Sequence, residues 1–312
     1  KNNNFKSIIE NIDIGGPTLV RAAAKNFDDV LVITNPRNYI HVINEINKYK
    51  GSTSLNFRKQ MAINAFNEIA NYDSIIANYF NDKFNVSFPN KKTFSGTLVE
   101  NLRYGENPHQ NAAIYSTYKD LNLKHLHGKK LSFNNYNDIF SALSISRSFK
   151  KNEGTVILKH ANPCGVSKER DKLKSFKSAI NCDPISAFGG IVSSNFKINK
   201  KLAEQINKFY FEVIIANGFD KDALKILKKK KNIRLIDATN FKNNGNYAFT
   251  FYKETFMYQS PDDIIINKKN LKTVSKKKPT KKQLESLIFT MNTCKYVKSN
   301  AIVLAKDKLT IG

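Results

Sequence analysis

Residues 155–194 read TVILKHANPCGVSKERDKLKSFKSAINCDPISAFGGIVSS, and this stretch decides the fold class. The apolar run at 155–159 predicts a buried strand that ends in a Pro/Gly loop. Residues 173–180 have the apolar spacing of a helix, and the run at 188–193 predicts a second strand. Strands that alternate with helices in this way are typical of α/β layers.

The same alternation extends toward the C-terminus. Three more apolar runs predict strands, at residues 213–216, 233–236 and 301–304. Three amphipathic stretches predict helices, at residues 202–211, 223–231 and 280–297. The second part of the chain is therefore expected to form a sheet whose strands are connected by helices.

The N-terminal part has a pattern of its own. Residues 29–34 (DVLVIT) predict a buried strand, and residues 38–49 predict a helix. Thr53 and Ser54 are suitable caps for a long helix that follows them. From about residue 84 to residue 99 the periodicity gives way to Pro, Gly and polar residues. We place a domain boundary there and predict two domains, residues 1–90 and 91–312.

The composition restricts the classes of function. The 312 residues include 51 Lys and Arg but only 26 Asp and Glu, which gives a net charge of +25. Only seven of the basic residues are Arg. Abundant Lys, Asn and Ile indicate the codon bias of an AT-rich genome rather than base recognition, which relies on Arg. The excess charge helps to attract anionic substrates.

The sequence also bears on the cellular compartment and on membrane association. No apolar run approaches the roughly 20 residues of a membrane-spanning helix. Three cysteines, an odd and sparse set, form no disulfide framework, which favours a reducing cytoplasm.

The first chemical motif is ENIDIGGPTLVRAAAKN at residues 10–26. Gly15 and Gly16 predict a tight turn, and Pro17 suits the first turn of a helix whose free N–H groups can hold an anion. Asp13 precedes the turn, and Lys25 lies about two helical turns beyond Pro17. On these residues alone, an ordinary turn and helix is the simpler interpretation.

Two further motifs carry groups suited to substrate binding and proton transfer. In LRYGENPHQ, residues 102–110, Arg103 can hold a phosphate or carboxamide with its planar fork, and Tyr104 can stack or donate a hydrogen bond. In KHANPCG, residues 159–165, His160 can accept a proton from a weakly nucleophilic amine. Lys159 beside it can stabilise negative charge on an oxygen. Taken singly, a polar loop and a strand-end Lys–His pair would explain both motifs.

A zinc deaminase is a rival interpretation. Pro163-Cys164 matches half of the PCxxC ligand motif, but position 167 is Ser and no H-x-E motif precedes it. His125 and His127 have no cysteines nearby in the sequence. We therefore expect no metal.

Together the motifs resemble the family of bifunctional enzymes that formylate AICAR and close the product to IMP. Residues 10–26 resemble the family's cyclohydrolase pattern, and residues 102–110 and 159–165 resemble RYGENPHQ and KHANPCG of its transformylase domain. Four more matches follow in the family's order: LSFNN with Asp138, DPISAFGG (183–190), FEVIIA (211–216) and VKSNAIV (297–303). Residues 253–259 lack the glycines of the family's GGLLVQ segment, and Asn217 replaces a frequent Pro.

The resemblance implies a fold and an activity. The implied fold is α/β: the C-terminal part of a methylglyoxal-synthase-like cyclohydrolase domain, then a truncated cytidine-deaminase-like transformylase domain. The implied reaction is formyl transfer from 10-formyltetrahydrofolate to AICAR, giving FAICAR, followed by cyclodehydration to IMP without a metal. The implied partners are these nucleotides, folate and a second copy of the chain in a homodimer, with no specific nucleic acid and no membrane.

The resemblance also implies roles for individual residues. Lys159 and His160 would be catalytic in formyl transfer, with His160 as general base. Lys25 and Asp13 would be catalytic in ring closure: Lys25 in its acid–base chemistry, and Asp13 by contacting the nucleotide and assisting. The positions that would bind substrate are Arg103, Tyr104, Asn135, Gly189, Glu212 and Asn300.

Parts of the family's pattern are missing from this sequence. Its N-terminal phosphate-binding loops and its GAGQxSR segment are not found, so we expect the 312 residues alone to have little or no activity. Two rival classes stay open. Salt-dependent binding to nucleic acid would favour a basic nucleic-acid-binding protein, and metal analysis would reveal a zinc deaminase.

Overall fold

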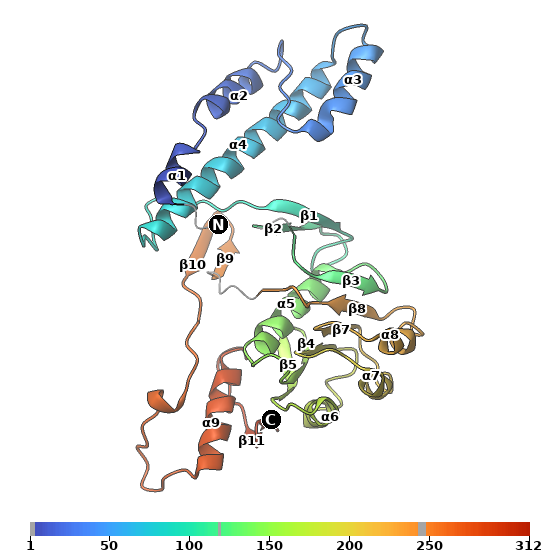
Figure 1. Cartoon of the computed structure of the whole chain (residues 1–312), viewed down its shortest axis with the longest axis vertical. Coiled ribbons are helices and arrows are strands. Elements are labelled where there is room, and N and C mark those ends of the chain that lie inside the picture. The colour runs from blue at the N-terminus through green and yellow to red at the C-terminus, as the bar shows by residue number, and fades with distance from the viewer. Residues whose placement is uncertain (1–3, 118–119, 243–247) are drawn as a thin grey trace. The chain divides into compact units, whose positions relative to one another are not determined.

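The polypeptide divides after Gly96 into two units, Lys1–Gly96 and Thr97–Gly312 (Figure 1). The division lies within the segment at residues 84–99 where the sequence loses its periodicity. The computed structural model describes residues 4–117, 120–242 and 248–312. Among those residues, no helix has both the length and the apolar character needed to cross a membrane.

The described part of the first unit is helical. It contains α1 (Phe5–Glu10), α2 (Gly15–Lys25), the 3-10 turn η1 (Pro36–Asn38), α3 (Tyr39–Lys48) and α4 (Leu55–Lys83). Ser54 begins α4, because its Oγ accepts the N–H of Phe57 at 3.3 Å. The guanidinium of Arg58 donates to the carbonyl oxygens of Phe27 (2.9 Å) and Asp28 (2.6 Å), which fixes the turn after α2 against α4.

The strand predicted for residues 29–34 is wrong. Asp29 lies in a turn, and residues 30–34 form neither a helix nor a strand within the described part of this unit. A strand needs a neighbour for its N–H and C=O groups, and apolar side chains alone cannot supply one. Val30, Leu31, Val32 and Ile33 are accordingly only partly buried.

The second unit is built on an eight-stranded mixed sheet with the order β11-β12-β5-β4-β6-β7-β8-β3. Among the described strands of this sheet, only β6, β7 and β8 are parallel to one another. The strands are β3 (Lys124–His127), β4 (Thr155–Lys159), β5 (Asn162–Ser167), β6 (Ile191–Ser194), β7 (Val213–Ala216), β8 (Arg234–Asp237), β11 (Ala305–Lys306) and β12 (Leu309–Thr310). Two separate hairpins are formed by β1 (Thr97–Leu102) with β2 (Ala112–Ser116) and by β9 (Ala248–Tyr252) with β10 (Thr255–Gln259).

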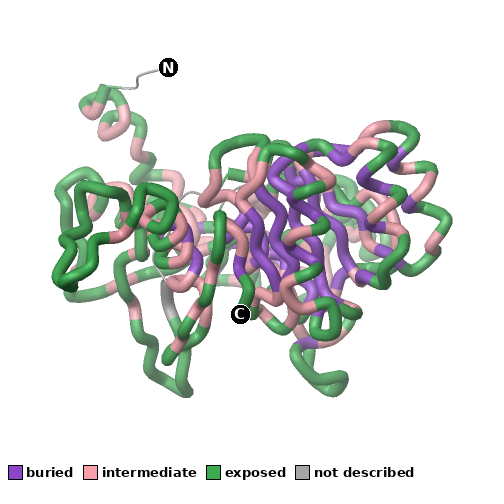
Figure 2. Tube along the Cα trace, turned by 90° about the horizontal axis from the view of Figure 1, so that it is seen from below, coloured by how far each residue is buried: buried purple, intermediate pink, exposed green. Residues whose placement is uncertain are grey.

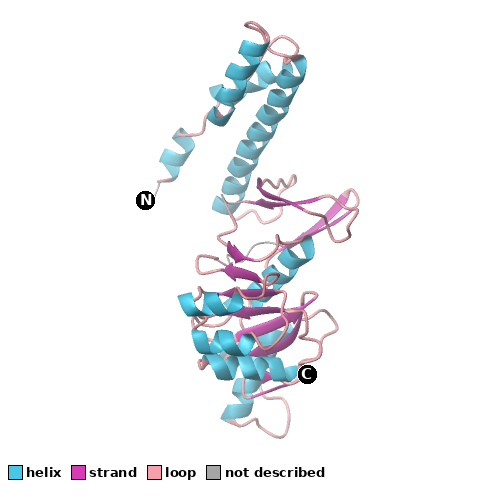
Figure 3. Cartoon of the chain, turned by 90° about the vertical axis from the view of Figure 1, so that its right-hand side faces the viewer, coloured by secondary structure: helices cyan, strands magenta, loops and turns pink. Residues whose placement is uncertain are grey.

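Helices cover both faces of the large sheet (Figures 1 and 3). One face packs against α6 (Lys172–Cys182), α7 (Lys200–Ile206) and α8 (Lys221–Leu227), and the other packs against α5 (Phe133–Arg147) and α9 (Lys281–Cys294). Successive strand residues alternate between the faces: Ile157 lies on the α6 side, and Val156 and Leu158 lie on the α5 side. Buried residues are concentrated in these central strands (Figure 2).

Most predicted elements of this unit are confirmed. Strands form at residues 155–159, 213–216 and 234–237, and the predicted helices are present with somewhat different ends. The second strand begins at Ile191, because Gly189 at φ 73° is outside the extended region. The strand predicted at residues 301–304 is wrong, because the strand in this region, β11, begins only at Ala305.

The predicted Pro/Gly loop after residue 159 is also wrong. Residues 162–167 form β5, which pairs with β4 from Lys159↔Asn162 to Thr155↔Ser167. Pro163 is compatible with this strand, because β12 reaches β5 only at Ser167 and leaves the strand at an edge beside the proline.

Candidate functional site

The chemistry-bearing residues of the second unit gather at one edge of the large sheet. Leu158 pairs with Ile191, and Ile191 pairs with Val213, which pairs with Arg234. The end of β4 therefore lies level with the starts of β6, β7 and β8. This register brings Lys159, Gly189, Glu212 and Arg234 to the same edge. We call it the catalytic edge, after the roles predicted for Lys159 and His160.

His160 stands at the tip of the β4–β5 hairpin. It forms a two-residue turn with Ala161, and their φ angles are 54° and 57°. Such turns fit the twist of a hairpin, but they favour Gly and Asn, and an ordinary L-residue in this conformation costs roughly 1–2 kcal/mol. The imidazole is exposed, so a ligand can reach it.

Asp138 of α5 lies beneath this turn. Its Oδ1 accepts the N–H of Ala161 at 2.7 Å. Burial raises the pKa of the Asp138 carboxyl, while the N–H of Ala161 and the imidazole of His160 act in the opposite direction. The carboxyl group of Asp138 is thus close enough to His160 for the two side chains to interact electrostatically.

Lys159 lies on the other side of the turn. Its ammonium donates to the carbonyl oxygen of Phe188 at 2.9 Å, directly before Gly189. Gly189 adopts φ 73° and donates its N–H to the carbonyl of Tyr210. A Cβ on Gly190 would lie 2.7 Å from the carbonyl oxygen of Leu158. Gly190 therefore lets this loop approach the end of β4 closely, and Gly189 permits the positive φ beside it.

Cys164 lies in β5 close to the same edge. Burial, with Asp183 adding to it, raises the pKa of its thiol to about 11, and the positive charge of Lys159 offsets part of this. The thiol is therefore protonated at neutral pH and is a poor nucleophile there.

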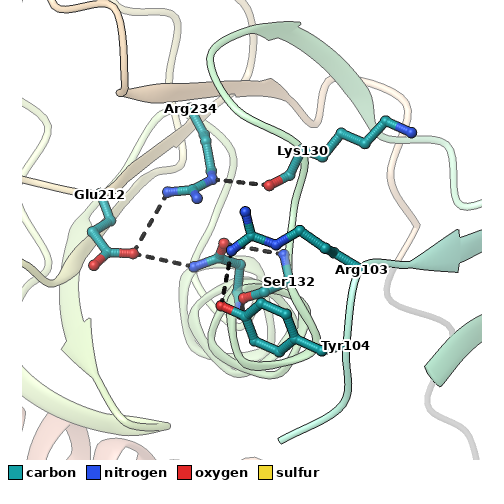
Figure 4. A network of polar contacts seen from close by, with 7 residues as sticks. Arg103, Tyr104, Lys130, Ser132, Glu212 and Arg234 are labelled. Atoms are coloured by element: carbon teal, nitrogen blue, oxygen red, sulfur yellow. Dashed lines mark hydrogen bonds and ion pairs between the residues drawn. The ribbon is translucent and has the colours of Figure 1, made fainter. Parts of the chain in front are cut away.

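Glu212 is the centre of a polar network at the start of β7 (Figure 4). Its Oε2 accepts from Asn135 Nδ2 at 3.4 Å and lies 3.6 Å from Arg234 Nη1. Asn135 also caps α5, because its Oδ1 accepts the N–H of Ser132. Arg234 in turn donates to the carbonyl of Lys130 at 3.4 Å. The network orients both a carboxylate and an amide at the catalytic edge.

Arg103 and Tyr104 approach the same helix end from the loop after β1. The guanidinium of Arg103 lies 4.8 Å from the centre of the Tyr104 ring and donates to its hydroxyl at 3.2 Å. Two contacts hold β1 and this loop on α5: Asn134 donates to the carbonyl of Glu106 in the loop at 3.3 Å, and Tyr136 donates to Glu100 of β1 at 3.0 Å. Figure 4 shows the Arg103 guanidinium pointing across the start of α5, where Ser132 lies.

Of the predicted site residues of this unit, all but one join the network or flank it. The exception is Asn300, which is exposed in the segment after α9. In the part of the chain that the structure describes, no hydrogen bond or ion pair connects Asn300 with the catalytic edge. Its predicted role stays a prediction.

Asp13 and Lys25 of the first unit lie at opposite ends of α2. Asp13 Oδ1 accepts the N–H of Gly16 at 2.9 Å, and Tyr72 Oη accepts the N–H of Asp13 at 2.8 Å. A Cβ on Gly16 would lie 2.2 Å from Asp13 Oδ2, so glycine permits this tight turn. Lys25 ends the helix, roughly 15 Å further along its axis. The two side chains are therefore too far apart to exchange a proton directly.

Two groups of the catalytic edge have no predicted role. Asp138 was part of a matching motif, and its spacing from Asn135 places both on one face of α5, which the sequence could have indicated. The sequence could not have indicated Arg234, because its proximity to Glu212 depends on the register of β7 and β8. Among the described residues, no group of His, Cys, Asp and Glu side chains is arranged to hold a metal ion.

Comparisons with known proteins give a consistent result. The sequence profile of the AICARFT/IMPCHase bienzyme family matches residues 23–312. A protein named "Bifunctional purine biosynthesis protein PurH" from Thermoanaerobacter sp. (strain X514) is 42% identical over 316 residues, which cover 100% of this chain and 62% of the relative. The protein of the same name from Acetivibrio thermocellus is 42% identical over 323 residues, with the same coverage. That from Bradyrhizobium diazoefficiens is 39% identical, with 99% and 60% covered. The chain thus spans about three fifths of the length of these relatives.

Proposed function

The chain belongs to the AICARFT/IMPCHase bienzyme family, and from this premise we propose that it takes part in purine biosynthesis. We propose two reactions: formyl transfer from 10-formyltetrahydrofolate to AICAR, and cyclodehydration of the product FAICAR to IMP. The relatives' name, which describes a bifunctional purine biosynthesis protein, supports this assignment. The observation that carries it is the exposed His160 imidazole beside Lys159 at the catalytic edge.

Formyl transfer requires one proton to move as one bond forms and another breaks. The 5-amino nitrogen of AICAR attacks the formyl carbon, and His160 accepts the proton that this nitrogen loses. The ammonium of Lys159 stabilises the negative charge that develops on the formyl oxygen. The bond from the formyl carbon to N10 of the folate then breaks, and His160 returns the proton to N10.

The remaining groups of the catalytic edge suit the binding of AICAR. Arg103 can pair with its phosphate or carboxamide, and the Tyr104 ring can stack on a planar base. Glu212, held by Asn135 and Arg234, accepts hydrogen bonds from ribose hydroxyls or amino groups. Gly189 offers close approach of the backbone. We also assign Asn300 to AICAR binding.

Ring closure is assigned to the first unit. There the carboxamide nitrogen of FAICAR attacks the formyl carbon and water leaves. We assign the proton transfers to Lys25 and nucleotide binding to the turn that Asp13 holds at the start of α2. Their separation along α2 supports two distinct tasks rather than one shared proton.

The finer structural assignments are part of the same proposal. We infer a methylglyoxal-synthase-like cyclohydrolase domain that ends near residue 90, a cytidine-deaminase-like transformylase domain after it, and a homodimer. We place the enzyme in the reducing cytoplasm, which the three free cysteines support. The residues of the catalytic edge require no metal or redox cofactor for these steps.

The test is the substitution His160→Ala in the protein extended by the segments that its relatives have beyond these 312 residues. Formyl transfer should fall by at least about 100-fold, since loss of a general base typically costs 10²–10⁴-fold. Ring closure of supplied FAICAR should be nearly unchanged, because its proposed residues lie in the other unit. Equal loss of both activities, or full formyl transfer in the variant, would refute the assignment.

A further inference from the structure

The conformation of the hairpin tip needs an explanation of its own. His160 and Ala161 are consecutive L-residues at φ 54° and 57°, and neither is the Gly or Asn that such turns favour. Strained backbone of this kind persists only where its surroundings determine it. Whatever holds the turn also determines where the imidazole of His160 stands.

The support comes from the carboxyl group of Asp138. The N–H of Ala161 donates to Asp138 Oδ1 at 2.7 Å, and the N–H of His160 faces the same carboxyl group. Successive N–H groups of a turn that point at one carboxylate form a small anion-binding nest. Ala161 and Asp138 are both partly buried, so water competes little for this contact.

Asp138 is itself held on a rigid element. It follows Asn135 by almost one turn on α5, and Asn135 binds Glu212 of the catalytic edge. Ile139 and Ala142 of the same helix are fully buried against the sheet. The carboxyl group is therefore fixed relative to the sheet, and its hydrogen bond to Ala161 holds the turn in place.

We propose that Asp138 is a positioning residue for formyl transfer, whose Oδ1 fixes the His160–Ala161 turn and so places the imidazole at the catalytic edge. This inference rests on the proposed function of His160. Asp138 acts through its acceptor oxygen on backbone N–H groups and does not touch the reacting atoms.

Three variants separate this role from a general loss of stability. Asp138→Ala removes the acceptor, whereas Asp138→Asn keeps an Oδ1 that can accept the same N–H. Adding Ala161→Gly to Asp138→Ala lets the turn adopt its conformation without support. Asp171→Ala is the matched control, because Asp171 Oδ1 accepts the N–H of Lys174 at 2.7 Å at the start of α6, away from the catalytic edge.

Two measurements are made on each variant. Hydrogen exchange of the residue 160 and 161 amides is followed by NMR in the 312-residue chain, and kcat and KM for AICAR are measured in the extended protein. Asp138→Ala should speed exchange of the Ala161 amide by roughly tenfold or more. It should lower kcat on the order of 100-fold, as expected for a misplaced base, with KM within about threefold. Asp138→Asn should keep most of the protection of the Ala161 amide and most of kcat. Adding Ala161→Gly to Asp138→Ala should raise kcat at least about tenfold above that of Asp138→Ala alone.

Several outcomes would overturn the proposal. Unchanged exchange of the Ala161 amide in Asp138→Ala would show that the carboxyl group does not hold the turn. Faster exchange with unchanged kcat in Asp138→Ala would show a structural role only. An equal loss of kcat in Asp171→Ala would show the same. If the unsubstituted extended protein has no formyl transfer, the proposed function fails, and the exchange measurement alone decides whether Asp138 holds the turn.

Discussion

At the scale of single residues, the chemistry of the catalytic edge depends on which groups each side chain contacts as well as on the residue types. Lys159 binds the carbonyl of Phe188, Asn135 binds Glu212, and Asp138 binds the turn that carries His160. Each contact joins segments that are far apart in the sequence. The residue types were recognisable in the motifs, but these pairings depend on the folded sheet.

The raised pKa of Asp138 leads to a prediction about stability and pH. Burial raises its pKa above the ordinary value of 3.8, so the folded protein keeps this proton to a higher pH than the unfolded chain does. The folded state binds more protons in that window, and the free energy of unfolding contributed by Asp138 must fall as pH rises through it.

Asp138→Asn cannot titrate and serves as the reference. The difference in free energy of unfolding, unsubstituted protein minus variant, should decline as pH rises from about 3.5 and then become constant above the raised pKa. Urea unfolding of both proteins at matched pH values measures this difference. A difference that grows with pH would mean that the carboxylate is stabilised in the folded state and that burial is not the dominant cause.

At the scale of elements, close contact between β5 and α6 depends on Gly165. A Cβ at this position would lie 1.9 Å from the carbonyl oxygen of Ala179 and 3.1 Å from Cys182 Cβ. Gly165→Ala must therefore push α6 away from the strand. We expect the free energy of unfolding to fall by roughly 1–3 kcal/mol, as for other overpacked cores.

Ser167→Ala, two residues along the same strand, is the control for this prediction. Ser167 is fully buried and its hydroxyl has no hydrogen-bond partner among the described residues. Removing that hydroxyl should leave stability unchanged or raise it by up to about 1 kcal/mol. Chemical denaturation of both variants tests the pair, and a larger loss in Ser167→Ala than in Gly165→Ala would contradict the packing described for β5.

The sequence predicted those elements whose partners lie within the chain. The apolar runs of β4 and β7 have neighbours on both sides, and their predicted bounds agree with the structure. Residues 29–34 have a strand pattern but no partner in the described unit, and they stay irregular. Periodicity reports which side chains prefer burial, but it carries no information about whether a hydrogen-bonding neighbour exists.

The prediction for residues 159–162, a loop where the structure has a hairpin, was wrong for a different reason. Pro and Gly in NPCG indicated a loop, whereas the turn is made by His160 and Ala161, which are unusual turn residues. Tertiary support from Asp138 overrides the local preference there. For the candidate site, the motifs predicted a role for Lys159 and His160, while the placement of Arg234 and Asp138 required the sheet register and the helix position.

At the scale of the whole molecule, the two units differ in how much core they have. Among the described residues, most buried apolar side chains belong to the second unit, and those of the first unit are Ala24, Met61, Ala62, Ala65 and Ile69. Large side chains such as Ile14 and Leu19 of the first unit are more than two-thirds exposed. Because apolar burial is the main source of stability, we expect the second unit to be the more stable and to present its site without help from the first.

The net charge of +25 complicates any binding measurement at this scale. A strongly basic protein attracts every phosphate-bearing ligand through its overall field, and such attraction weakens as salt is added. Specific recognition of AICAR must therefore be distinguished by where it occurs and not by affinity alone. Inorganic phosphate at the same concentration and ionic strength is the matched control.

The most direct measurement is an NMR titration of the 312-residue chain with AICAR, observed at the Gly189 amide and the His160 imidazole. If the catalytic edge binds the substrate, AICAR should shift both signals in a saturable way at physiological ionic strength, and phosphate should not reproduce the imidazole shift. Shifts scattered over lysine-rich surfaces with none at Gly189 or His160 would contradict the assignment of this edge to formyl transfer.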